Sequence, residues 1–313
     1  MVNMEIRKKT KVLLGPSSFA EMHRSPLDRL LSANFEVIDN PYKRKLTEDE
    51  LLKLLPGVEG LIAGLEPLNR RVLEASCLKV ISRCGSGLSN VDLQAAKDLG
   101  IVVRNTPSGP TTAVAELTLG CLLCLLRQVP QMNHALHQKI WSKRVGRQLQ
   151  GSCVAVIGFG AIGRKVGQML YACGARVIAV DPVLSGIVEN IEIVALGAAL
   201  KKADIITIHA SGEDCLLGNN EFALMKEGVY ILNAARGGLV DEKALVDAID
   251  NKKVAGAWLD TFNKEPYNGI LCKHDEVILT PHIGSYTIEC RRNMEMESVE
   301  NLINSFELKA SHV

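Results

Sequence analysis

The sequence has few aromatic residues and almost no net charge. Phe, Trp and Tyr make up 4% of its 313 residues, while 36 Lys and Arg balance 35 Asp and Glu. The resulting net charge of +1 provides no field that would attract a polyanion or an anionic lipid surface. We therefore expect a small-molecule partner, with no nucleic acid and no membrane among its partners.

Long apolar runs and disulfide patterns are missing as well. No segment reaches the roughly 18 uninterrupted apolar residues that span a bilayer. The apolar run near the amino terminus, VLLG, is too short for a signal peptide. The nine cysteines are odd in number and show no spacing typical of disulfides. These features favour the reducing environment of the cytoplasm.

Two short motifs resemble metal sites but lack the remaining ligands. Cys121 and Cys124 form a C-x-x-C inside the leucine-rich run LGCLLCLL, and a zinc site would need a second pair of ligands. His134 and His137 have helical i, i+3 spacing without a cysteine or carboxylate partner. We interpret the cysteines as buried helix residues and the histidines as a solvated helix face, and expect no metal.

The sequence does contain a regular alternation of β-branched strands and helical segments, which is typical of α/β proteins. Its length suits two domains, each able to bury a core. The Pro/Gly/Ser cluster Asn105–Pro110 is the expected hinge. The last helix, from Ile288 to about Leu308, is expected to return to the first domain. We thus predict one domain of residues 1–106 plus 288–313 and another of residues 107–287.

Strands are expected in both domains. The expected strands are Lys11–Leu14, Phe35–Ile38, Gly60–Ala63, Lys79–Ser82 and Ile101–Arg104 in the first domain, and Ile205–Ile208, Tyr230–Asn233, Gly256–Leu259 and Val277–Leu279 in the second. A long helix is expected at Thr111–Arg127, followed by a polar stretch to Gly151.

The most specific segment is SCVAVIGFGAIGRKVGQMLYACGARVIAVD, from Ser152 to Asp181. An apolar strand leads into Gly158, Gly160 and Gly163, a helical pattern follows, and a second strand ends at Asp181. Glycine at this spacing permits a tight turn, close approach of the backbone to a pyrophosphate, and close packing of helix on strand. The helix start, which includes Ala161 and Ile162, offers N–H groups and a positive dipole end. The segment therefore predicts a dinucleotide site.

Three later segments carry reactive side chains just after expected strands. In LNAARGGLVD, Arg236 follows a strand, where its planar fork suits a carboxylate. In LDTFNKEP, Asp260 and Glu265 follow the next expected strand. In LTPHIGS, His282 follows the last one. Because open α/β sheets bind ligands at the carboxyl ends of their strands, these side chains are candidates for one site. A carboxylate near His282 would favour its imidazolium form and fix the ring.

Together these segments identify a resemblance. The chain resembles the NAD-dependent D-2-hydroxyacid dehydrogenase family over nearly its whole length, through RCGSGLSNVD, TTAVAELTLG, GFGAIG, NAARGGLVDEKAL, LDTFNKEP and TPHIGS in the family's order. The resemblance implies two doubly wound parallel-sheet domains, flavodoxin-like and Rossmann, with a cleft between them. The first would be the substrate domain and the second the NAD-binding domain, and the family usually forms homodimers through the second.

The resemblance also implies roles for the residues. Arg236 would bind the substrate carboxylate, His282 would donate the proton in reduction, and Glu265 would keep His282 protonated. Asp260 and Ala234 would contact the cofactor. The backbone at Ser86 and Gly87 would bind the carboxylate from the other domain, since glycines there permit close approach.

Single residues and the resemblance also bear on which cofactor and which substrate the protein uses. Asp181 favours NAD, because a carboxylate there would accept hydrogen bonds from the ribose hydroxyls and repel a 2′-phosphate. The resemblance is greatest to D-3-phosphoglycerate dehydrogenases, which act in serine biosynthesis, in a short form. A phosphate would need cations, and Arg70, Arg83 and Arg104 are the candidates.

Two alternatives stay open. One is a glyoxylate or hydroxypyruvate reductase, and the other is a non-catalytic NAD(H)-sensing protein like the C-terminal binding protein corepressors. Two departures from the family pattern bear on the site. The loop HASGEDCLLG replaces a Pro-Leu-Thr type of run, and Ser89 stands where an aspartate is common. Cys84, beside the loop that contains Ser89, is interpreted as a packing residue.

Overall fold

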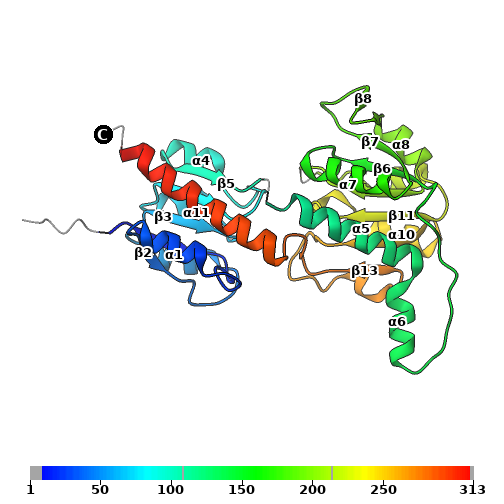
Figure 1. The fold of residues 1–313 in the computed structure, drawn as a ribbon, viewed down its shortest axis with the longest axis horizontal. Coiled ribbons are helices and arrows are strands. Elements are labelled where there is room, and N and C mark those ends of the chain that lie inside the picture. Colours follow the sequence, from blue (N-terminus) through cyan, green and yellow to red (C-terminus); the bar gives the residue numbers. More distant parts are fainter. Residues whose placement is uncertain (1–8, 108, 213, 311–313) are drawn as a thin grey trace, which may run out of the picture. The chain divides into compact units, whose positions relative to one another are not determined.

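The computed structural model describes residues 9–107, 109–212 and 214–310. The chain divides into two compact units (Figure 1), of which unit 1 comprises Met1–Pro110 with Tyr286–Val313 and unit 2 comprises Thr111–Ser285. Three parts of the sequence discussed above lie outside the described residues. They are most of the amino-terminal segment considered as a leader, Ser108 of the expected hinge, and Glu213 of the loop HASGEDCLLG.

Unit 1 is a parallel sheet with helices on its faces. Its elements are β1 (Lys11–Leu14), α1 (Ser25–Ser32), β2 (Glu36–Ile38), α2 (Glu48–Leu54), β3 (Gly60–Ala63), α3 (Arg70–Glu74), β4 (Val80–Arg83), α4 (Leu93–Asp98), β5 (Val102–Asn105) and α11 (Ile288–Ala310). The strand order β2-β1-β3-β4-β5 is the flavodoxin-like one. This order confirms the doubly wound architecture expected for the first part of the chain.

The sequence of unit 1 explains this arrangement locally. All four residues of β3 are buried, as in a strand covered on both faces. Side chains of Thr47, Asn69 and Asp92 accept a backbone N–H at the starts of α2, α3 and α4. Helix α11 packs beside α1 and lies against β3, β4 and β5 (Figure 1). The carboxyl-terminal helix thus completes the core of the first unit.

Unit 2 is a larger sheet, also with helices on both faces. Its elements are α5 (Thr111–Arg127), α6 (Val129–His137), β6 (Cys153–Ile157), α7 (Ala161–Ala172), β7 (Arg176–Val180), β8 (Ile187–Val188), β9 (Ile191–Ile193), α8 (Leu196–Lys202), β10 (Ile205–Ile208), α9 (Asn219–Leu224), β11 (Val229–Asn233), α10 (Glu242–Asp250), β12 (Val254–Leu259) and β13 (Val277–Leu279). The order is β13-β12-β11-β10-β6-β7-β9-β8, with β8 antiparallel to β9 and the other pairs parallel. The strand order reverses between β6 and β10, where doubly wound sheets bind ligands.

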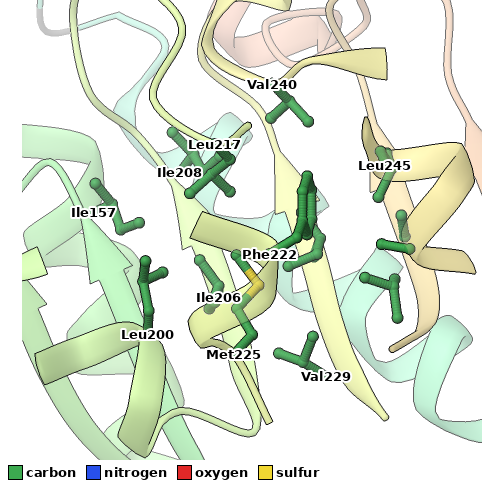
Figure 2. Close-up of a cluster of buried hydrophobic side chains, with 14 of the residues drawn as sticks. Ile157, Leu200, Ile206, Ile208, Leu217, Phe222, Met225, Val229, Val240 and Leu245 are labelled. Atoms are coloured by element: carbon green, nitrogen blue, oxygen red, sulfur yellow. The ribbon is translucent and has the colours of Figure 1, made fainter. Parts of the chain in front are cut away.

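Two apolar clusters cover the two faces of this sheet. Along β10, Ile206 and Ile208 belong to one cluster and Ile205 to the other, because successive strand residues point to opposite faces. Figure 2 shows the first cluster, in which Phe222 of α9 and Met225, just after α9, lie over the strands. The sheet is therefore a rigid platform for the loops at its edge.

Four neighbouring strands of unit 2 end at the same level. The register pairs Ile208 with Asn233, Asn233 with Leu259, and Leu259 with Leu279. The residue after each strand therefore begins a loop at the same carboxyl edge, and these residues are His209, Ala234, Asp260 and Thr280. We call these four residues the edge row.

Two parts of unit 2 go beyond the elements expected from the sequence. Helix α6 covers Val129–His137 within the stretch expected to be polar, where only the spacing of His134 and His137 indicated a helix, and β8 with β9 forms a short hairpin after β7. No residue of α6 is buried, so no apolar face in the sequence indicates it. Gln128, with φ of 50°, separates α6 from α5. Within the described residues, no single helix is long and apolar enough to cross a membrane, and only the pair α5 and α6, bent by 66°, reaches that length together.

Candidate active site

The turn after β6 needs glycine at two of its three positions for reasons internal to the fold. Gly158 has φ of 88°, and a Cβ there would lie 2.4 Å from the backbone nitrogen of Ala210. A Cβ on Gly163 would lie 2.0 Å from the carbonyl oxygen of Gly158. The first glycine thus permits the turn, and the third permits α7 to approach the strand.

No contact within the protein requires glycine at the middle position, Gly160. A Cβ on Gly160 would meet no protein atom within 4 Å, so this face of the turn is open. Gly160 is the N-cap of α7 and offers no side-chain cap to the helix. The first-turn N–H groups, including those of Ala161, Ile162 and Gly163, have no partner within the helix and lie at the positive end of its dipole. The turn therefore fits the pyrophosphate of a dinucleotide, which would approach Gly160 and bind these groups.

Replacing Gly160 with alanine tests this assignment. We expect the variant to fold normally and to bind NADH about ten-fold more weakly or worse, a loss of ~1.4 kcal/mol, because the methyl group would occupy the open face. Isothermal titration with NADH and thermal unfolding give the two quantities. Gly197→Ala in α8 is the control, since a Cβ there also meets no atom within 4 Å. Normal NADH affinity of Gly160→Ala would contradict the assignment.

Asp181, directly after β7, is held against the same turn. Its Oδ2 accepts a hydrogen bond from the N–H of Phe159 at 3.0 Å, and its Oδ1 accepts one from the N–H of Val183 at 3.0 Å. The nearby Arg164 forms an ion pair with Glu189 at 3.1 Å. The carboxylate thus has a fixed position beside the turn, while the neighbouring cation is already neutralised.

Arg236 follows β11 and is oriented by the buried Asn233. The side-chain amide of Asn233 donates to the carbonyl of Arg236 at 2.8 Å and accepts from the N–H of Ala235 at 3.0 Å. The guanidinium Nη1 donates to the carbonyl of Ala235 at 2.7 Å. Among the described residues no acidic side chain forms an ion pair with Arg236, which is half-buried. Its charge is therefore available for an anionic ligand.

Gly237 lets the Arg236 loop pack against the loop after β12. A Cβ on Gly237 would lie 2.0 Å from the carbonyl carbon of Phe262. Ala234, of the edge row, is half-buried at the end of β11. Asn233 and Gly237 were not singled out in the sequence, although both lie within the segment LNAARGGLVD. Asparagine and glycine are common at the ends of strands, so the sequence gives no sign of their roles. The hydrogen bonds of Asn233 and the close packing at Gly237 show these roles.

Glu265 and His282 form a pair, which the sequence could only suggest. His282 Nδ1 lies 3.0 Å from Glu265 Oε2, and the two side chains are 37% and 34% exposed. The other carboxylate oxygen, Oε1, accepts the N–H of Phe262 at 3.1 Å. The acceptor at Nδ1 places a proton on that nitrogen and leaves Nε2 as the ring atom that can exchange a proton with a ligand.

Asp260 is buried and anchors the loop that carries His282. Its Oδ1 accepts from the Thr280 hydroxyl at 2.6 Å and from the N–H of Ile283 at 2.8 Å. Its Oδ2 accepts from the N–H of Gly284 at 2.8 Å. Burial raises the pKa of Asp260, and the three donors oppose that rise. Both oxygens thus have protein partners, and the expected contact of Asp260 with the cofactor stays a prediction.

His209, the remaining member of the edge row, is unsuited to proton transfer. Burial lowers its pKa to about 3, so the ring is neutral at physiological pH. Its Nε2 lies 2.8 Å from the hydroxyl of Thr207. Of the two histidines that follow strands of this edge, only His282 has a carboxylate partner and an exposed ring.

In unit 1, Ser86 and Gly87 lie in the loop after β4. The N–H of Gly85 donates to the hydroxyl of Thr106 at 2.7 Å, and Asn105 Nδ2 donates to the carbonyl of Ser86 at 2.7 Å. These bonds fix the loop, with Ser86 exposed and Gly87 half-buried. Binding of a carboxylate by this backbone stays a prediction.

The other sequence candidates have structural explanations. Cys84 is buried, and burial raises the pKa of its thiol to about 12, so it is not a nucleophile at neutral pH. Cys121 is buried in α5, and Cys124 is half-buried. His134 and His137 are exposed on α6. In the described parts of the chain, no group of three or more His, Cys, Asp or Glu side chains is placed to hold a metal.

Comparison with known proteins identifies the family to which this site belongs. Residues 119–284 match the NAD-binding domain of the D-isomer specific 2-hydroxyacid dehydrogenases. A hydroxypyruvate reductase from Thermotoga maritima is 37% identical over 268 residues, which cover 82% of this chain and 88% of that protein. A D-3-phosphoglycerate dehydrogenase from Pongo abelii is 38% identical over 260 residues, which cover 80% of this chain and 49% of that protein. The chain thus spans about half the length of this second relative.

The fold comparison agrees. The crystal structure of a Thermus thermophilus protein superimposes with a TM-score of 0.88 at 33% identity, covering 95% of this chain and 97% of that one. The segment with the glycine turn and the Arg236, Glu265 and His282 loops falls within the matched NAD-binding domain. This chain therefore belongs to the D-isomer specific 2-hydroxyacid dehydrogenase family, and residues 119–284 are its NAD-binding domain.

Proposed function

We propose that the protein transfers a hydride between NAD(H) and a D-2-hydroxy acid or its 2-keto acid. The observation that carries the proposal is the contact between His282 Nδ1 and Glu265 Oε2 at 3.0 Å. This pair lies at the same sheet edge as Arg236, which has no acidic partner among the described residues. A merely structural dinucleotide domain would need neither a partly exposed histidine–carboxylate pair nor an arginine without an acidic partner.

Each side chain has a chemical task in this proposal. Arg236 binds the substrate carboxylate through its planar guanidinium fork. When bound, the reduced nicotinamide supplies the hydride that adds to the carbonyl carbon of the keto acid. His282 donates a proton from Nε2 to the carbonyl oxygen, which becomes the hydroxyl, and it takes that proton back in oxidation. Glu265, at Nδ1, fixes the ring and stabilises its charged form.

The cofactor we propose is NAD rather than NADP. Asp181 is fixed beside the glycine turn by two backbone N–H groups, where its charge would repel a 2′-phosphate. Arg164, the neighbouring cation on α7, is paired with Glu189 and lies over the Phe159 ring at 5.2 Å. Arg164 thus already has a carboxylate and an aromatic ring as partners.

For the substrate, we propose an unphosphorylated 2-keto acid such as hydroxypyruvate or glyoxylate, because the hydroxypyruvate reductase is matched over 88% of its length and the phosphoglycerate dehydrogenase over 49%. Of the three arginines considered for a phosphate, Arg70 pairs with Asp98 at 2.7 Å and with Glu74 at 3.4 Å. Arg83 donates to the carbonyl of Cys84 at 2.7 Å, whereas Arg104 is exposed in β5 and stays a candidate for a phosphate. The phosphoglycerate dehydrogenase-like activity expected from the sequence, and with it a place in serine biosynthesis, stays the second candidate.

A panel of 2-keto acids with NADH and NADPH tests the proposal. We expect NADH oxidation with hydroxypyruvate or glyoxylate to exceed that with phosphohydroxypyruvate, and NADPH to be the poorer donor. Faster turnover of phosphohydroxypyruvate would support the second candidate. Tight NADH binding without turnover of any keto acid would overturn the enzymatic proposal and favour an NAD(H)-sensing protein.

We also propose a cytoplasmic homodimer. The segment that includes and follows α6 exposes five large apolar side chains, Val129, Leu136, Ile140, Trp141 and Val145, which are 44%, 56%, 57%, 79% and 95% exposed. Large apolar side chains exposed along one segment suit a surface that another chain covers. All nine cysteines are free thiols, as in a reducing compartment. Analytical ultracentrifugation tests the assembly, because a single 34.0 kDa species would contradict it.

A further inference from the structure

Thr280, which directly precedes the Pro-His segment, makes two hydrogen bonds through one hydroxyl group. Its Oγ1 accepts the indole N–H of Trp258 at 2.9 Å and donates to Asp260 Oδ1 at 2.6 Å. Trp258 is fully buried and Asp260 is 2% exposed. Asp260 and Thr280 follow neighbouring strands at the same level, because the register pairs Leu259 with Leu279, and Trp258 lies two residues before Asp260 in β12.

The direction of these bonds is fixed by chemistry. An indole N–H can only donate, so the Thr280 oxygen accepts from Trp258 and its single proton is directed to Asp260. The carboxylate, oriented in this way, accepts the N–H groups of Ile283 and Gly284, which directly follow His282. The hydroxyl therefore links the rigid sheet to the loop on the carboxyl side of His282.

The loop needs this support because of its backbone conformation. His282 has φ of 54°, in the left-handed region that non-glycine residues occupy at a cost. On the amino side, the N–H of His282 bonds to the carbonyl of Thr280 at 2.9 Å. Thr280 therefore contacts the strained residue through its backbone and stabilises the far side of the loop through Asp260.

We propose that Thr280 is a positioning residue for His282, its hydroxyl fixing the Asp260 carboxylate and thereby the loop that presents the imidazole. The inference rests on the proposed function, in which His282 exchanges the proton. Displacement of a reacting group by about 1 Å costs on the order of 100-fold in rate. Thr280 would thus affect the chemical step without contacting substrate or cofactor.

The matched pair Thr280→Val and Thr280→Ser tests the inference. Valine keeps the shape and removes both hydrogen bonds, whereas serine keeps the hydroxyl. We expect valine to lower kcat about 10- to 100-fold with little change in the KM for the keto acid and in NADH affinity, and serine to restore most of kcat. Rates are referred to the concentration of NADH-binding sites, so that unfolded protein does not count.

Ser305→Ala is the control for loss of a buried hydroxyl. Ser305 is 4% exposed in α11 of unit 1 and donates to the carbonyl of Asn301 at 2.7 Å, so it has no contact with the loop of Thr280. We expect this variant to lose thermal stability and to keep kcat per binding site. A wild-type kcat per site for Thr280→Val, with His282→Asn inactive, would overturn the positioning role. Activity of His282→Asn close to the wild type would instead refute the proposed function.

Discussion

Arg236→Ala is expected to lower kcat/KM for the keto acid by about 10²- to 10³-fold, since truncating one partner of a hydrogen-bonded charge pair costs about 2–5 kcal/mol. NADH affinity should stay nearly unchanged, because the glycine turn and Asp181 lie at the ends of β6 and β7. Steady-state kinetics and NADH titration measure the two effects.

Arg236→Lys separates charge from shape. Lysine keeps the positive charge but loses the planar fork that binds both carboxylate oxygens. We expect its kcat/KM to lie between those of the wild type and Arg236→Ala. An equal loss of NADH affinity in both variants would show that Arg236 maintains the cofactor site rather than binding the substrate.

His282→Asn is expected to lower kcat about 10²- to 10⁴-fold, the usual contribution of a general acid. Asparagine can still hydrogen-bond to Glu265 but cannot carry the transferred proton. Glu265→Gln should have a smaller effect in the same direction, because the ring keeps a neighbour of the same shape and loses the charge that stabilises imidazolium. Single-turnover measurements of NADH oxidation report the chemical step.

The double variant tests whether the two residues act as one unit. If Glu265 acts through His282, adding Glu265→Gln to His282→Asn should cost little more than His282→Asn alone. Additive losses would mean that Glu265 has a separate task. Wild-type NADH affinity in all three variants is the control for folding.

The dinucleotide turn could be predicted because it is local. Gly158, Gly160, Gly163 and Asp181 lie within one β–α–β segment, whose geometry the spacing largely determines. The structure adds a distinction that spacing does not contain. Gly158 and Gly163 satisfy contacts within the protein, whereas Gly160 leaves an open face for a ligand.

The proton-transfer pair was harder to predict because it depends on strand register. Glu265 follows β12 and His282 follows β13, and their contact requires Leu259 to lie level with Leu279. Sequence periodicity indicates that strands exist but not how far they are shifted. The partners of Asp260 were missed for the same reason, since Thr280 has no signal of its own beside Pro281 and His282.

The edge row has a consequence for how this protein tolerates insertions. The relative positions of His209, Ala234, Asp260 and Thr280 are set by strand pairing and not by the loops that follow them. Residues added to or removed from the loop after His209 should therefore leave the spacing of the other three unchanged. An insertion inside β12 would instead displace Asp260 relative to Thr280. Because Ala210 of the loop after β10 packs against Gly158, changes in this loop should act on the cofactor turn and leave the loops of Arg236, Glu265 and His282 in place.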